Sequence, residues 1–103
     1  MGFAVPAYDP PSLPVAGSED RFPVRRIYCV GRNYVAHARE MGADERDPPF
    51  FFLKPNDAIV QNGASIPYPA ATEDYHYEGE LVAAIGKGGE NISVEDANDH
   101  IFG

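Results

Sequence analysis

The stretch Tyr75-His76-Tyr77-Glu78-Gly79-Glu80-Leu81-Val82 sets two carboxylates two residues apart and leads directly into an apolar segment. Its aromatic and aliphatic content predicts a β-strand from Tyr75 to Ile85. Side chains at i and i+2 of a strand point to the same face, so Glu78 and Glu80 would converge. A hard divalent cation would relieve their repulsion, and ligation by oxygen alone favours Mg²⁺, Mn²⁺ or Ca²⁺ over zinc. The stretch therefore predicts half of a metal site.

The same pattern has a plain structural explanation. Polar and apolar residues alternate on any half-exposed strand, and this places two glutamates two residues apart without any function. On such a strand Tyr77 and Leu81 would lie on the opposite, apolar face. His76 is expected beside the metal ligands or at the surface, because a histidine ligand would draw the site toward softer metals.

A second candidate group lies upstream, in Gly31-Arg32-Asn33-Tyr34-Val35-Ala36-His37-Ala38-Arg39-Glu40-Met41-Gly42. Asn33 is a suitable N-cap and Gly42 a suitable stop for a short helix over about residues 34–41. This helix would bring His37 and Glu40 together at i and i+3. Glu40 could then orient the imidazole while its other nitrogen takes a proton from water. The alternative is an ordinary, partly exposed helix histidine with a glutamate neighbour.

Two short strands are predicted on either side of this helix. The run from Val24 to Val30 is rich in β-branched and aromatic residues and ends at a glycine, and Phe50 to Leu53 is a short apolar run typical of a buried strand. Lys54 follows the second strand directly, where its charge could stabilise an anion. A solvated lysine is the commoner outcome for this residue type.

Proline and glycine divide the rest of the chain. Residues 1–24 are proline-rich and are expected to form an extended arm that precedes the body at 25–103. The charged segment from Gly42 to Pro49 is a candidate lid loop, and residues 57–71 are expected to form a hairpin-like excursion. Ser93 is expected to cap a last helix, with Asp96 in a capping-box position. Ten Gly and ten Pro in 103 residues favour a β-rich, mixed α/β architecture over a helical bundle.

The charge balance narrows the class of partner. Sixteen acidic residues against eight basic ones give a net charge of −8, without a basic cluster to follow a phosphate backbone. Nucleic acid is therefore excluded as the expected partner. The chain shows neither a membrane-spanning run nor a secretory signal, and its single Cys29 cannot form an internal disulfide. A cytoplasmic location is the default expectation.

Four motifs stand in a fixed order and spacing along residues 26–103. The first runs from Gly31-Arg32-Asn33-Tyr34 through His37 and Glu40 to Met41-Gly42, and the others are Phe52-Leu53-Lys54-Pro55, Tyr77-Glu78-Gly79-Glu80-Leu81 and Ala84-Ile85-Gly86-Lys87. Taken together, they closely resemble the fumarylacetoacetate hydrolase family. Within the family, the chain is most similar to the fumarylpyruvate hydrolase and acylpyruvase-like branch, including its proline-rich arm.

The resemblance implies a fumarylacetoacetase C-terminal-domain-like fold of mostly antiparallel sheets with short helices, usually assembled as a homodimer. It implies a Mg²⁺- or Mn²⁺-dependent hydrolase that cleaves a C–C bond in a 2,4-dioxo acid such as fumarylpyruvate, in aromatic catabolism. Carried over by position, Glu78 and Glu80 would be metal ligands, His37 with Glu40 would activate water, and Lys54 would help to hold the oxyanion.

The chain departs from the family pattern in one respect. Members of the family supply a third carboxylate ligand, an Asp on a later strand. The motif that contains this Asp follows a turn similar to Ile101-Phe102-Gly103. Asp96 and Asp99 precede that turn and do not match the motif. The 103-residue chain is therefore expected to be the N-terminal part of a longer enzyme and to be inactive alone. A 2-oxoacid decarboxylase or hydroxyheptadienedioate isomerase on the same fold, and a non-catalytic interaction module, stay open as alternatives.

Overall fold

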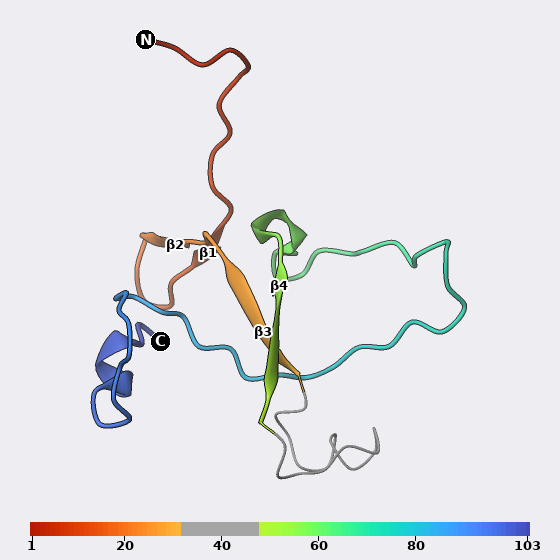
Figure 1. Ribbon diagram of the computed structural model, residues 1–103. Helices are drawn as coiled ribbons and strands as arrows, with labels where there is room; N and C mark the ends of the chain where they lie inside the picture. Colours follow the sequence, from red (N-terminus) through yellow and green to blue (C-terminus); the bar gives the residue numbers. More distant parts are fainter. Residues whose placement is uncertain (32–47) are drawn as a thin grey trace. The chain divides into compact units, whose positions relative to one another are not determined.

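The computed structural model describes residues 1–31 and 48–103, which form two compact units, Met1–Ile66 and Pro67–Gly103. The described elements are short strands and single-turn 3₁₀ helices (Figure 1). Within the described residues, no helix has the length and apolar character needed to cross a membrane. The β-rich architecture predicted from the glycine and proline content is confirmed.

The first unit begins with a small hairpin inside the predicted arm. Strands β1 (Ser12–Pro14) and β2 (Arg21–Pro23) pair antiparallel, with Leu13 opposite Phe22. Gly17 turns the chain between them at φ +75°, a left-handed conformation that glycine adopts without strain. The prediction of an arm that is merely extended was therefore wrong for residues 12–23.

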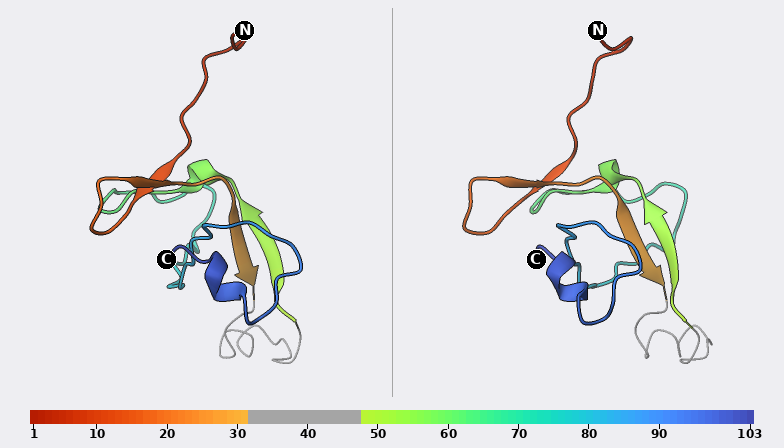
Figure 2. Two further views of the ribbon diagram at one scale, coloured as in Figure 1. Left: turned by 90° about the vertical axis from the view of Figure 1, so that its left-hand side faces the viewer. Right: turned by 60° about the vertical axis from the view of Figure 1, so that its left-hand side comes forward.

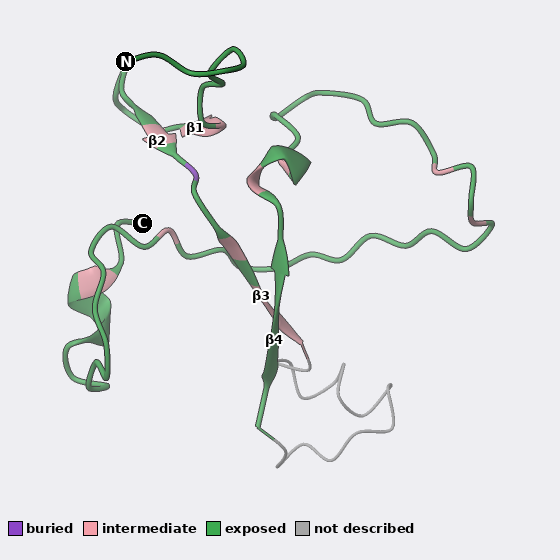
Figure 3. Ribbon diagram, turned by 45° about the horizontal axis from the view of Figure 1, so that its top comes forward, coloured by how far each residue is buried: buried purple, intermediate pink, exposed green. Residues whose placement is uncertain are grey.

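Side chains fasten this hairpin to a later part of the same unit. Arg21 Nε donates to Ser12 Oγ at 2.7 Å, and its Nη2 donates to the Ser12 carbonyl at 2.9 Å and to Gln61 Oε1 at 3.3 Å. Gln61 Nε2 donates to the same Ser12 carbonyl at 2.9 Å. Val24 follows the hairpin and is the single buried hydrophobic residue in the described part of the chain (Figure 3). Asn56 Nδ2 donates to the Val24 carbonyl at 3.0 Å.

The two strands predicted around the helix are present. Strand β3 (Ile27–Gly31) pairs antiparallel with β4 (Phe50–Lys54) in a register that sets Ile27 opposite Lys54 and Gly31 opposite Phe50. Figure 2 shows them side by side as a two-stranded ribbon. All five residues of β4 are exposed, so the prediction of a buried strand was wrong. Within the described residues, the β3–β4 pair joins no further strand, which leaves the apolar side chains of β4 exposed.

The hairpin-like excursion expected at residues 57–71 and the last helix expected after Ser93 both differ from the structure. The 3₁₀ helix η1 (Asn56–Ala58) follows β4, and no strand pairs within the expected hairpin at 57–71. In the second unit, Ser93 Oγ accepts the Asp96 N–H at 3.2 Å, as predicted, but the helix is only the 3₁₀ turn η2 (Ala97–His100).

The C-terminal segment of the second unit folds back on itself. Ile85 and Ile101 form an antiparallel bridge, flanked by hydrogen bonds from Phe102 N–H to the Ala84 carbonyl at 2.7 Å and from Gly86 N–H to the His100 carbonyl at 2.9 Å. This short pairing lies at the end of the strand predicted from Tyr75 to Ile85, and it is the part of that strand that the structure contains.

Candidate active site

The two candidate metal ligands lie in the second unit, on backbone that is not a strand. Residues 75–84 have no ladder partner among the described residues, so the predicted strand from Tyr75 was wrong. Tyr77 and Leu81 were expected to cover an apolar face, yet they are 96% and 92% exposed. A strand is stabilised by the hydrogen bonds of its neighbour, and apolar patterning alone does not replace them.

Glu78 and Glu80 are both exposed, and within the described chain no hydrogen bond or ion pair is recorded for either carboxylate. A Cβ added to Gly79, between them, would meet nothing within 4 Å. The two carboxylates are therefore solvated and open to a ligand from outside the described residues.

The donor chemistry at these residues fits a hard divalent cation. Carboxylate oxygens are the preferred protein ligands of Mg²⁺ and suit Mn²⁺, and such ions are commonly held by one or two carboxylates together with water and substrate. No group of three His, Cys, Asp or Glu residues in the described part of the chain could hold a metal. The metal-binding roles of Glu78 and Glu80, and the third ligand, therefore stay predictions.

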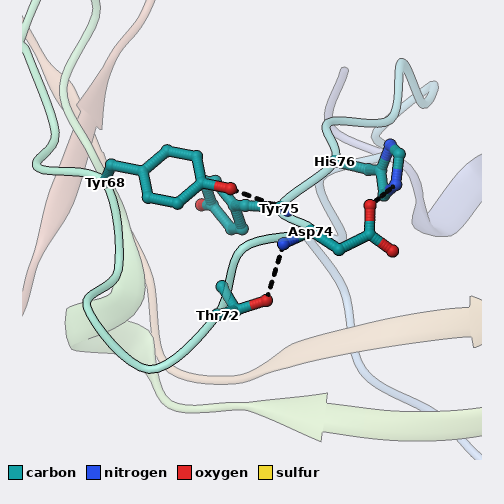
Figure 4. A network of polar contacts seen from close by, with 5 residues as sticks. All are labelled: Tyr68, Thr72, Asp74, Tyr75 and His76. Carbon is teal, nitrogen blue, oxygen red and sulfur yellow. Dashed lines mark hydrogen bonds and ion pairs between the residues drawn. The ribbon is translucent and has the colours of Figure 1, made fainter.

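His76 lies at the surface, one of the two positions expected for it. Its Nε2–H donates to Asp74 Oδ1 at 2.6 Å, and both side chains are largely exposed (Figure 4). The carboxylate fixes the tautomer, because a carboxylate oxygen can only accept.

The contacts around Tyr68 were not anticipated. Tyr75 N–H donates to Tyr68 Oη at 3.1 Å, and the two rings meet edge to face at 5.5 Å between centroids and 81° between planes (Figure 4). A signal was present in the sequence, since Tyr68 stands between Pro67 and Pro69, which restrict the backbone on either side of it.

Lys54 ends β4 in the first unit and is exposed. Its ammonium group makes no hydrogen bond or ion pair with the described residues, and its role at an oxyanion stays a prediction. His37 and Glu40, with the predicted helix over residues 34–41 and most of the candidate lid loop, lie outside the described residues, so their roles stay predictions.

A sequence model described as "Fumarylacetoacetate (FAA) hydrolase C-terminal" matches residues 26–103. The fold is similar to that of a solved fumarylpyruvate hydrolase from Pseudomonas aeruginosa in complex with Mn²⁺ and pyruvate. That protein is 56% identical in sequence with a TM-score of 0.88, over 97% of this chain and 45% of the other.

Two relatives with other activities also match. The mitochondrial oxaloacetate decarboxylase of Dictyostelium discoideum is 42% identical over 80 residues, which are 77% of this chain and 37% of that protein. The mitochondrial oxaloacetate tautomerase FAHD1 of Arabidopsis thaliana is 40% identical over 78 residues, 76% of this chain and 35% of that protein. The chain thus spans less than half the length of each of these proteins.

Proposed function

Because this chain belongs to the fumarylacetoacetate hydrolase family, we propose that the complete protein is a metal-dependent hydrolase of a C–C bond in a 2,4-dioxo acid. Fumarylpyruvate is the proposed substrate, with pyruvate and fumarate as products. The observation that carries the proposal is the similarity, along nearly the whole chain, to the fumarylpyruvate hydrolase that binds Mn²⁺ and pyruvate.

We assign the metal to Glu78 and Glu80, because they are exposed carboxylates open to a ligand. When bound, Mg²⁺ or Mn²⁺ would act as a Lewis acid toward the oxygens of a 2-oxo carboxylate. The two glutamates would supply negative charge and hard oxygen donors, and would thereby select such ions over zinc. The assay below compares turnover with Mg²⁺ and with Mn²⁺.

The proposed reaction needs a water molecule made nucleophilic at neutral pH. His37 would accept a proton from this water, while Glu40 would accept the other imidazole N–H and so fix the tautomer. The water oxygen then adds to the acyl carbonyl, the C–C bond breaks, and its electron pair leaves on the pyruvate fragment, which takes up a proton. Lys54 would place a positive charge near the oxygen that becomes negative.

The test is product analysis with the complete protein. Fumarylpyruvate is incubated with Mg²⁺ or Mn²⁺, and pyruvate and fumarate are quantified, with EDTA treatment as the control. Equal amounts of the two acids that disappear on chelation support the proposal. Turnover that yields one isomer of the substrate, as in a hydroxyheptadienedioate isomerase, would contradict hydrolysis.

Oxaloacetate is the second candidate substrate, favoured by the similarity to an oxaloacetate decarboxylase and an oxaloacetate tautomerase. A 2-oxo acid bound at the metal that Glu78 and Glu80 would hold could lose carbon dioxide or exchange its keto and enol forms. Carbon dioxide release, or a change in the enol absorbance without loss of substrate, distinguishes these reactions from hydrolysis. The lack of turnover with both substrates would favour a non-catalytic interaction module.

A homodimeric assembly in the cytoplasm belongs to the same proposal. Closed twofold dimers are the commonest assemblies of soluble oligomeric proteins. The molar mass of the complete protein in solution, measured by light scattering, tests the dimer.

A further inference from the structure

Tyr68 closes a loop that ends three residues before the first proposed metal ligand. The Tyr75 N–H donates to Tyr68 Oη at 3.1 Å, and the ring of Tyr75 stands edge to face on that of Tyr68 (Figure 4). Both contacts join the same two residues, one through the backbone and one through the rings. Tyr68 thereby holds Tyr75 at two points.

The loop between these tyrosines is stiff at both ends. Pro67 and Pro69 fix their own φ angles and keep the residues before them out of the helical region, so Tyr68 presents its ring from restricted backbone. At the other end, the Asp74 N–H donates to Thr72 Oγ1 at 3.0 Å. Side chains thus satisfy the N–H groups of Asp74 and Tyr75, which have no strand partner in the described chain.

The segment that carries the two glutamates is exposed to solvent. Tyr77, directly before the first glutamate, is 96% exposed, and Gly79 adds backbone freedom between the two. Two exposed ligands joined by a glycine must be ordered when a metal binds, and this ordering lowers the affinity. A fixed point just before Glu78 reduces the number of conformations that have to be given up.

We propose that Tyr68 is a positioning residue for the metal ligands Glu78 and Glu80, acting through its hold on Tyr75. The inference rests on the proposed metal-binding role of these glutamates. The contacts of Tyr68 in the described part of the chain are with Tyr75, and we assign it no step of the reaction. Its contribution is to the binding of the metal, so its loss would raise the dissociation constant for Mn²⁺.

The test is a titration of the complete protein with Mn²⁺, in which free Mn²⁺ is followed by electron paramagnetic resonance. Tyr68→Phe keeps the ring contact and removes the acceptor oxygen, and Tyr68→Ala removes both. We expect the dissociation constant to rise about threefold in the first variant and about tenfold in the second, sizes typical of a lost hydrogen bond and a lost aromatic pair. The matched control is Tyr8→Phe, at an exposed tyrosine that has no partner among the described residues. We expect this variant to leave the dissociation constant for Mn²⁺ unchanged.

The outcomes separate this inference from the proposed function. If both Tyr68 variants bind Mn²⁺ as tightly as the wild-type protein does, the positioning role is overturned and the metal site stands. A lower unfolding temperature with unchanged Mn²⁺ affinity also overturns it, because Tyr68 would then serve only the fold. A wild-type protein that binds no Mn²⁺ overturns both the metal site and the inference that depends on it.

Discussion

A Cβ atom at Gly31 would collide with the ring of Phe50, the residue directly opposite it in the β3–β4 pair. The Phe50 ring therefore lies across the glycine, and it also contacts Phe52, with ring centroids 6.2 Å apart. Glycine in a strand usually weakens it, but here the missing side chain makes room for an aromatic one.

Gly31→Ala is expected to lower the free energy of unfolding of the complete protein by about 1 kcal/mol, because the Phe50 ring must leave its position. Gly88→Ala, where a Cβ meets nothing within 4 Å, is the control in chemical denaturation. In a Phe50→Ala background the same substitution is expected to be neutral or stabilising. A loss of equal size in both backgrounds would show that the ring contact is not the cause.

The hydrogen bonds of Arg21 are expected to hold the β1–β2 hairpin in place. Arg21→Met removes donors to Ser12 and Gln61 and is expected to cost about 1 kcal/mol of stability, since these groups are exposed. Arg25→Met removes an exposed arginine with no recorded partner in the described residues and is the matched control. Equal unfolding midpoints for the two variants would contradict a stabilising role for Arg21.

Glu78→Gln and Glu80→Gln are each expected to lower metal-dependent turnover by about a hundredfold or more. Mutation of a residue that only hydrogen-bonds a metal ligand already lowers metal affinity or activity about ten- to hundredfold. Each removes a negative charge while it keeps the size of the side chain. Glu90→Gln, at an exposed glutamate elsewhere in the second unit, is expected to leave turnover unchanged. Turnover and Mn²⁺ affinity near wild type in either ligand variant would refute the assignment.

His37→Ala is expected to reduce kcat by about 10² to 10⁴, the usual contribution of a general base. Glu40→Gln is expected to reduce it less, because the imidazole can still act from a less favourable tautomer. Mn²⁺ affinity stays at the wild-type value in both, since neither residue is assigned to the metal. Full activity of His37→Ala would remove the mechanistic basis of the proposal.

The sequence predicted the local elements better than their surroundings. The β-branched residues of β3 and the apolar run of β4 identified both strands. The predicted bond from the Asp96 N–H to Ser93 Oγ is present, but Asp96 and not Ser93 is the N-cap of η2. The hairpin at residues 12–23 was missed, although Gly17 was a turn signal, because the surrounding prolines outweighed it. The burial of β4 was predicted wrongly, since it depends on neighbours that a short pattern does not specify.

The candidate site was predicted by residue type and not by geometry. Glu78 and Glu80 are exposed and their metal-binding role stays a prediction, while the strand expected to align them lacks a partner in the described chain. The contact between Tyr68 and Tyr75 depends on a loop closure seven residues apart, which no periodic pattern encodes. Asp96 and Asp99 do not match the family's motif for a third carboxylate, so that ligand stays a prediction.

The most direct test of the central claim is the yield of pyruvate from fumarylpyruvate when the complete protein is stripped of metal and then supplied with Mn²⁺. We expect the stripped protein to be inactive and the restored protein to release one pyruvate and one fumarate for each substrate consumed. Pyruvate release that persists without metal, or substrate loss without fumarate, would contradict a metal-dependent hydrolase of the C–C bond.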